Sequence, residues 1–260
     1  MRDVLELMKE TARLAGGIAL ERRRNFASAA VHIKGTPADL VTDVDRELER
    51  FIVSELKKGF PEYGFIGEEY GARNADSEWC FCIDPIDGTT SYVHDYPLYC
   101  VSIGLLHNGE SYAGVVYVPR LDELYYAEKG KGAFLNGNPI HVSACNTLET
   151  ALGATGFACI RARRSRNNLE YFNKIVPHLQ GVRRSGTAAF DMCQVAAGRI
   201  DGYWEFGLYL HDVAAGVIIA REAGAAVSDI NGGNDYTVSM VCSAQGIHQI
   251  LCDELQPGLS

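Results

Sequence analysis

The acidic residues of this sequence fall in short groups whose residue types and spacing suit metal binding. In the segment Asp84–Thr90 (Asp-Pro-Ile-Asp-Gly-Thr-Thr), one aspartate closes an apolar run and a second follows three residues later. Two carboxylates at one strand end can converge on one or two hard cations. The next residues are typical of a helix start, where free N–H groups favour phosphate. An exposed Asp-Gly turn gives the same local pattern, so the neighbouring groups decide the interpretation.

Glu68 and Glu69 form a second acidic group, directly after the short apolar run Gly64–Gly67. Adjacent side chains at a strand end point to opposite sides. One glutamate can therefore ligate a metal while the other polarises water. The alternative is a solvated turn.

Two further aspartates each have a local and a chemical interpretation. Asp212 stands before the small and apolar run Val213–Ala220. It is either an N-cap or, because so apolar a helix is buried, an acid that needs a partner such as a metal. Asp45 follows Thr42 with capping-box spacing. The sequence gives equal support to a capping role and to a role in the metal site.

Composition limits the classes of function. The chain has 260 residues, 47% of them hydrophobic, which suits one large domain or two closely packed halves. Its formal net charge of −9 does not favour nucleic acid or anionic lipid as a partner. The same charge would repel a phosphate substrate, so a local cation must reverse it.

Cysteine usage and hydropathy point to the cytoplasm. The eight cysteines lie in apolar settings, and a chain of this length needs no disulfide staples, so we expect reduced thiols. The N-terminal segment is amphipathic and has no signal-peptide core. No run of about 18 apolar residues is present, so we expect no membrane span.

Periodicity predicts a layered α/β (α+β) fold in two halves, 1–145 and 146–260, that pack as one unit. In the first half we expect helices over 2–24 and 42–58 and strands over 64–67, 79–84, 98–106, 111–118, 123–127 and 133–142. In the second half we expect strands over 152–157, 182–184, 203–206, 225–229 and 237–243, alternating with helices over 168–178, 188–197 and 213–223 and followed by a terminal helix.

A set of motifs in this order and spacing resembles the inositol monophosphatase family, in its general bacterial and animal branch. The matching segments are Asp39–Asp45, Gly67–Glu69, Asp84–Thr90, Gly186–Ala189, Ala196–Gly202 and Asp212–Gly216 with Glu222–Gly224. The resemblance implies a layered αβαβα sandwich of the inositol monophosphatase and fructose bisphosphatase type. It also implies a cytoplasmic, lithium-sensitive homodimer.

The resemblance further implies up to three Mg²⁺ ions per subunit. Glu68, Asp84 and the Ile86 carbonyl would bind the first ion. Asp84, Asp87 and Asp212 would bind the second, and Glu68 with water the third. Asp45 and Lys34 would lie nearby without direct ligation.

The remaining site residues are carried over from the same motifs. Glu69 and Thr89 would orient the attacking water, and the amides of Gly88 and Thr89 would hold the phosphate. The residues that would line the alcohol side of the substrate are Gly186, Thr187, Ala188, Glu205 and Asp212.

Two positions depart from the family pattern. His211 stands where the family commonly has tryptophan, and Ser91-Tyr92 where it often has Asn-Phe. Neither change removes a metal ligand, but both alter the expected pocket wall. We interpret His211 as structural, because metal-activated water needs no imidazole base.

These observations predict an enzyme that hydrolyses a small phosphate monoester, myo-inositol monophosphate first, by attack of metal-activated water without a covalent intermediate. Alternative substrates are fructose 1,6-bisphosphate, NADP, 3′-phosphoadenosine phosphate and histidinol phosphate. Direct attack by Asp84 or Asp87 is disfavoured by the crowding of acids. A second class is a regulatory protein that binds transcription machinery, for which the arginine-rich segment 161–166 is a candidate surface. A third class, metal storage, would not need a phosphate cradle.

Overall fold

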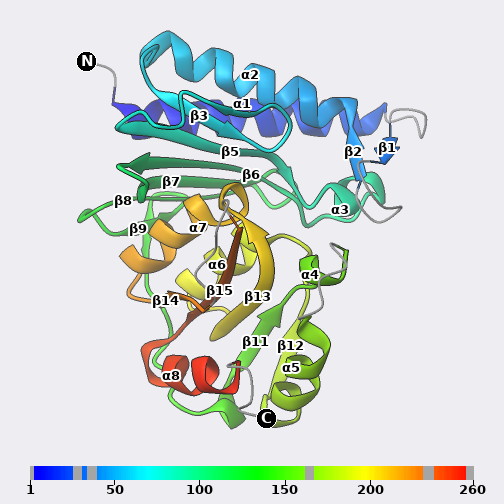
Figure 1. Ribbon diagram of the computed structural model, residues 1–260, viewed down its shortest axis with the longest axis vertical. Helices are drawn as coiled ribbons and strands as arrows, with labels where there is room; N and C mark the ends of the chain where they lie inside the picture. Colours follow the sequence, from blue (N-terminus) through cyan, green and yellow to red (C-terminus); the bar gives the residue numbers. More distant parts are fainter. Residues whose placement is uncertain (1–2, 26–30, 34–39, 162–166, 231–236, 256–260) are drawn as a thin grey trace.

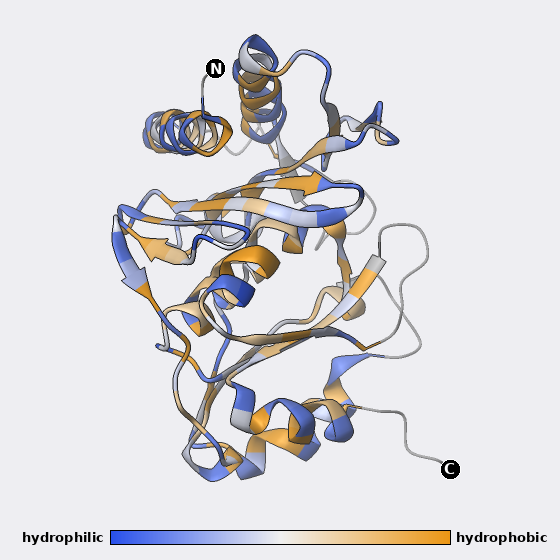
Figure 2. Cartoon of the chain, turned by 90° about the vertical axis from the view of Figure 1, so that its left-hand side faces the viewer, coloured by the Kyte–Doolittle hydropathy of each residue, from blue (hydrophilic) through white to orange (hydrophobic). Residues whose placement is uncertain are grey.

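The computed structural model describes residues 3–25, 31–33, 40–161, 167–230 and 237–255, and helices alternate with sheets in five layers (Figure 1). This arrangement confirms the predicted αβαβα sandwich. From one outer face to the other, the layers are α1 (Val4–Arg24) with α2 (Asp43–Gly59), an eight-stranded sheet, α6 (Ala188–Ala196) with α7 (Leu210–Glu222), a five-stranded sheet, and α5 (Asn168–Ile175) with α8 (Gln245–Glu254). In Figure 2 the outer helices α1 and α2 carry both hydrophobic and hydrophilic residues, as amphipathic helices do.

The eight-stranded sheet is mainly an antiparallel meander. Its strands, in spatial order, are β10 (Asn138–Ile140), β9 (Ala133–Leu135), β8 (Glu123–Glu128), β7 (Glu110–Val118), β6 (Cys100–His107), β5 (Trp79–Asp87), β3 (Gly64–Gly67) and β4 (Gly71–Arg73). The expected Asn-Gly hairpin joins β6 to β7, with φ of 50° at Asn108 and 82° at Gly109. The pair β3 and β5 is parallel, which places their C-terminal ends at one edge.

The second sheet is mixed. Its strands, in spatial order, are β12 (Gly181–Arg183), β11 (Leu152–Thr155), β13 (Gly202–Tyr209), β15 (Thr237–Ser243) and β14 (Ala226–Asp229). The shorter elements are β1 (Val31–Ile33), β2 (Leu40–Thr42), α3 (Thr89–Val93), α4 (Ala158–Arg161) and the 3₁₀ turns η2 (Leu148–Thr150) and η3 (Val176–His178). The predicted division near residue 145 falls between the two sheets and stays a prediction.

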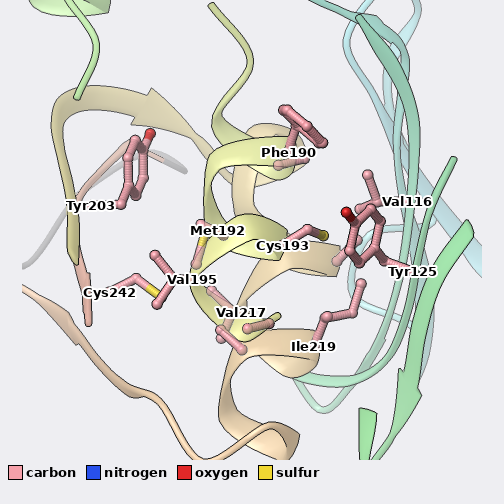
Figure 3. Close-up of a cluster of buried hydrophobic side chains, with 14 of the residues drawn as sticks. Val116, Tyr125, Phe190, Met192, Cys193, Val195, Tyr203, Val217, Ile219 and Cys242 are labelled. Carbon is pink, nitrogen blue, oxygen red and sulfur yellow. The ribbon is translucent and has the colours of Figure 1, made fainter. Parts of the chain in front are cut away.

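Helices α6 and α7 lie between the sheets and share one core with both. Figure 3 shows Met192 and Cys193 of α6 and Val217 of α7 among residues from either sheet. The contact of α7 with the first sheet is close: a Cβ added at Gly114 would lie 2.6 Å from the Ala215 carbonyl oxygen. A helix from the second half of the sequence is therefore fixed directly on the sheet of the first half.

Two expected element boundaries were wrong. Strand β5 does not end at Asp84 but continues to Asp87, with a register shift between the two aspartates that accommodates Pro85. Helix α7 begins at Leu210, and its N-cap is Tyr209, so Asp212 is not the N-cap.

The eight cysteines are free thiols, as predicted. Among the described residues, no helix is both long and apolar enough to cross a membrane.

Candidate active site

Glu68 and Asp84 are brought together by the parallel pairing of β3 and β5. Gly67 lies opposite Ile83, so each acid is the next residue along its own strand at the shared edge. The Glu68 amide donates to the Ile83 carbonyl over 3.2 Å. The two carboxyl groups are close enough to share a hydrogen bond.

Asp87 and Asp212 complete the group, which we call the acidic cluster (Glu68, Asp84, Asp87 and Asp212). The Oδ2 atom of Asp87 accepts from the Ala189 amide of α6 over 2.9 Å. Asp212, in the first turn of α7, accepts from the Tyr209 amide over 2.6 Å. The cluster therefore draws on β3, β5 and α7, with α6 holding one of its members.

Asp84 and Asp87 are the buried members of the acidic cluster, and the charges of the cluster repel one another. Burial, followed by the charges of Glu68, Asp87 and Asp212, raises the pKa of Asp84 well above its usual range. Burial and then the charge of Asp212 do the same to the pKa of Asp87. Such a group can be fully ionised only beside a cation.

The donor chemistry of the cluster fits a hard divalent cation, since Mg²⁺ takes oxygen ligands and is bound through carboxylates. The Ile86 carbonyl oxygen lies at the same bend and accepts the Thr89 hydroxyl over 3.2 Å. Within the described ranges, however, no three acidic, histidine or cysteine side chains are gathered tightly enough to hold a metal as they stand. Asp87 and Asp212 are held by hydrogen bonds from the Ala189 and Tyr209 amides, so joint ligation of a metal would require small side-chain rotations.

Asp45 has both a local and a site contact. It closes the predicted capping box at the start of α2, where its Oδ2 atom accepts the Thr42 amide over 2.8 Å. Its Oδ1 atom accepts the Thr89 hydroxyl over 3.1 Å. Burial raises the pKa of Asp45 to about 7, against the opposing effect of the Thr42 hydrogen bond and with a further increase from the charge of Glu68.

The start of α3 offers backbone donors beside the acidic cluster. Its N-cap, Gly88, has φ of 95° and supplies no side-chain cap, whereas Thr42 and Thr187 cap α2 and α6. A Cβ at Gly88 would lie 2.8 Å from the Thr187 Cγ2 atom, so glycine is required there for space as well as for backbone conformation.

Glu69 lies in a different environment from Glu68, as their adjacency predicted. Its side chain is 2% exposed, and its carboxylate is 3.8 Å from the Arg46 Nε atom. The amides of Glu69 and Tyr70 donate to the Glu49 carboxylate over 2.7 and 3.1 Å. Glu49 thus stabilises the turn at Glu68–Tyr70, a role that the sequence did not predict.

The predicted substrate residues largely share one pocket. It is lined by Asp87, Thr155, Gly156, Arg184, Gly186, Ala188, Asp191, Glu205, Leu208 and Asp212. Glu205 is held by the Ala158 amide and the Tyr203 hydroxyl, each over 2.9 Å. Thr187 lies beneath, as the N-cap of α6. Lys34 lies outside the described residues.

Arg184 and Asp191 are pocket residues that the sequence analysis did not single out. Asp191 could have been found from the sequence, because it is an acid within the apolar stretch Ala188–Ala196. The same argument was applied to Asp212. Its pKa is raised to about 8, chiefly by burial, with the charge of Glu205 adding and a Ser185 hydrogen bond opposing. His211 stacks on Tyr209 with ring centroids 5.4 Å apart, which suits the structural role expected for it.

Comparison with known proteins places the whole chain in one group. Residues 1–257 match the model of the inositol monophosphatase family. An inositol-1-monophosphatase of Mesorhizobium japonicum is 39% identical over 99% of this chain and 97% of its own. The Nus factor SuhB of Vibrio cholerae is 38% identical over 96% of this chain and 95% of its own. The solved structure of an inositol monophosphatase from Anabaena superposes with a TM-score of 0.87 at 38% identity, covering 98% of this chain and 96% of that one.

Proposed function

Because the chain belongs to the inositol monophosphatase family, a family of phosphatases, we propose that it is a Mg²⁺-dependent enzyme that hydrolyses a small phosphate monoester. We take myo-inositol monophosphate as the first substrate to test. The observation that carries this proposal is the acidic cluster, with Asp84 and Asp87 buried, beside the start of α3, which has no side-chain cap. Buried acids that repel one another make a cation site, and the neighbouring amides make an anion site.

We propose up to three bound metal ions. Glu68, Asp84 and the Ile86 carbonyl would hold one, Asp84, Asp87 and Asp212 a second, and Glu68 with water a third. Bound there, Mg²⁺ would activate a water molecule and neutralise charge on the phosphate oxygens. Family membership supports metal dependence, and the oxygen donor set supports magnesium.

The protein groups around this site would orient the attacking water. The single O–H of Thr89 donates to the Asp45 carboxylate, with the Ile86 carbonyl as the alternative acceptor, so the hydroxyl lone pairs are left to accept a hydrogen bond from water. The Glu69 carboxylate, held on the neighbouring turn, would accept a hydrogen bond from the second O–H of the same water. Two acceptors can fix the direction of the water lone pair toward phosphorus, and such positioning is a large part of catalysis in phosphoryl transfer.

The other end of the substrate would lie against Glu205. Its carboxylate is already oriented by the Ala158 amide and the Tyr203 hydroxyl. A buried, oriented carboxylate suits substrate hydroxyl groups, because each hydroxyl can donate to it. Arg184, in the same pocket, adds the one cationic side chain among its lining residues.

The decisive experiment is phosphate release from myo-inositol 1-phosphate with Mg²⁺, with EDTA and with added Li⁺. We expect release that EDTA abolishes and lithium inhibits. Fructose 1,6-bisphosphate, NADP and 3′-phosphoadenosine phosphate run in parallel would rank the sibling substrates. No release from any of them by folded, metal-replete protein would contradict the proposal.

Relatives named Nus factor SuhB support a second candidate, a protein that binds transcription machinery. The Vibrio cholerae protein of that name is 38% identical to this chain, against 39% for the named phosphatase from Mesorhizobium japonicum, so similarity does not separate the two. Binding that persists in a catalytically inactive variant would establish a separate role. Most of the candidate arginine-rich segment, residues 162–166, lies outside the described residues.

We also propose a homodimer, on the family resemblance. Light scattering on a sizing column should give twice the 28.4 kDa mass of the chain. A monomer at micromolar concentration would contradict this.

A further inference from the structure

A second pocket, which contains no member of the acidic cluster, lies between α2 and the β3–β4 hairpin. Its volume is about 300 Å³, at the lower end of small-molecule sites. We call it the α2–β4 pocket. It is lined by Glu49, Arg50, Val53, Ser54, Lys57, Phe65, Gly67, Tyr70, Gly71 and Arg73.

The α2–β4 pocket has a helical wall and a hairpin wall. Arg50, Val53, Ser54 and Lys57 follow the i, i+3, i+4, i+7 spacing that places side chains on one face of α2. The hairpin wall contains Tyr70 of the connecting turn, which is 37% exposed, and Phe65 of β3, which is 3% exposed. A flat apolar group can therefore lie against the Tyr70 ring, between the helical wall and the hairpin wall.

Three cations surround this apolar surface. Arg50 donates to the Tyr70 hydroxyl over 2.7 Å, and its guanidinium carbon lies 5.9 Å from the Tyr70 ring centroid. Arg73 lies at the same distance from that ring. The Lys57 Nζ atom is 5.3 Å from the Phe65 ring centroid. The charges thus converge on the aromatic surface rather than scatter over the exterior.

Within the described residues, none of the three pocket cations forms an ion pair with a carboxylate, whereas Lys9, Lys58 and Lys174 each contact a glutamate within 2.8 Å. Their charges are therefore not neutralised by direct carboxylate contact. Three grouped positive charges raise the local concentration of anions.

The one carboxylate in the lining does not cancel this charge for a ligand. Glu49 is 1% exposed, and its two oxygens accept the amides of Glu69 and Tyr70. A Cβ at Gly67 would lie 2.0 Å from its Oε1 atom, so the strand backbone covers it. Glu49 forms the floor of the pocket and faces the turn.

We propose that the α2–β4 pocket is a binding site for a small anion that carries a flat aromatic ring, with the ring against Tyr70 and the anionic group among Arg50, Lys57 and Arg73. None of these residues belongs to the acidic cluster or to the pocket around Glu205. The proposal therefore does not depend on the phosphatase activity.

The test is isothermal titration of the full chain with naphthalene-1-sulfonate, an aromatic anion that the enzyme cannot hydrolyse. We expect one site with a Kd on the order of 0.1–1 mM, as for a compact ligand of this size. Methanesulfonate, which has the charge without the ring, and 1-naphthalenemethanol, which has the ring without the charge, should each bind at least about fivefold more weakly. Equal binding of the uncharged ring would contradict the role of the cations.

Lys57→Met and Lys58→Met form a matched pair of variants. Both remove one positive charge from adjacent positions of α2, but Lys57 lines the pocket and Lys58 pairs with Glu55 outside it. Lys57→Met should weaken binding about fivefold or more, and Lys58→Met less than about twofold. Ser54→Trp, which fills the pocket and keeps all three cations, should abolish binding.

Three results would overturn the proposal. The first is no heat of binding with wild-type protein of native circular dichroism. The second is an equal loss in the two lysine variants, which would indicate a general charge effect. The third is an oligomeric state that Lys57→Met changes without any effect on the ligand, which would make this face a contact between protein chains.

Discussion

The two ends of helix α7 each carry a carboxylate, and the two acids have opposite surroundings. At the start, Asp212 faces Asp84 and Asp87 and raises the pKa of both through its charge. At the end, the two oxygens of Glu222 accept the amides of Gly130 and Gly132, each over 2.8 Å. The first acid adds to a group of like charges, and the second is satisfied by two donors.

The surroundings of Asp212 and Glu222 distinguish a carboxylate that can bind a metal from one that makes a structural contact. A carboxylate with two backbone donors is stabilised where it is, and it fixes the chain it contacts. A carboxylate among carboxylates is destabilised unless a cation joins it. Glu222 therefore holds the β8–β9 turn to α7, and of the two acids only Asp212 is proposed as a site residue.

The largest effect is expected from Asp212→Asn. Removal of a proposed metal ligand should lower kcat/KM more than about 100-fold, since even residues that only support ligands cost 10–100-fold. The metal-free variant should unfold at a higher temperature than metal-free wild type, because one repelling charge is gone. Thermal unfolding with EDTA and with Mg²⁺ measures this, and a variant that Mg²⁺ stabilises as much as wild type would place Asp212 outside the metal site.

Asp45→Asn should have an intermediate effect. The amide cannot accept from both the Thr42 amide and the Thr89 hydroxyl, so the hydroxyl loses its orientation. We expect kcat to fall about 10–100-fold with KM changed less than about threefold. Glu47→Gln, on the exposed side of the same helix, is the control. Equal kinetics in the two variants would show that Asp45 only caps α2.

Glu222→Gln should change stability and leave catalysis alone. One of two charge-assisted bonds to the glycine amides is weakened, which should lower the free energy of unfolding by about 1–2 kcal/mol. Urea unfolding measures this against Glu110→Gln at the exposed β6–β7 turn. The kcat/KM of the folded variant should stay within about twofold of wild type, and a larger fall would give Glu222 a part in the site.

Asp191→Asn should change the pH dependence of stability. The pKa of Asp191 is raised from 3.8 unfolded to about 8 folded, so the folded state keeps a proton that the unfolded state releases. The contribution of Asp191 to the free energy of unfolding is fully present below pH 4. It is lost as pH rises toward 8, by at most about 1.4 kcal/mol per pH unit. Asparagine does not titrate, so the variant lacks this pH dependence.

Urea unfolding in EDTA between pH 5 and 8 tests this. Asp84 and Asp87 give both proteins a slope of the same sign, which cancels in the difference. A wild-type curve parallel to that of Asp191→Asn would mean that Asp191 titrates normally.

The elements that rest on local patterns could be predicted from the sequence. The Asn-Gly turns, the capping box at Thr42 and the end of α7 before Gly224 are fixed by residues a few positions apart. The motif residues of the candidate site were named from the family resemblance, and their roles stay predictions. Periodicity does not predict which strands pair. The parallel pairing of β3 with β5 brings Glu68 beside Asp84, although the two residues are far apart in the sequence.

Residues whose role depends on packing were missed for the same reason. Glu49 lies on the buried face of α2 beside Leu48 and Ile52, which was a signal in itself, but its partners are amides of a distant turn. The α2–β4 pocket joins a helical stripe to a hairpin, and no sequence window contains both. Asp87 was expected beyond the strand, because the predicted strand ended at Asp84, whereas the register shift lets β5 continue to Asp87.

The position of α7 in the chain has a consequence for protein synthesis. Glu68, Asp84 and Asp87 belong to a sheet that is complete by residue 140, yet the helix that covers this sheet and supplies Asp212 comes 70 residues later. Until α7 is made, the growing chain has an uncovered apolar sheet face, and Glu68, Asp84 and Asp87 lack Asp212. The nascent protein is therefore most exposed to aggregation and to chaperone capture during that interval, and it can acquire its chemistry only after α7 has been made.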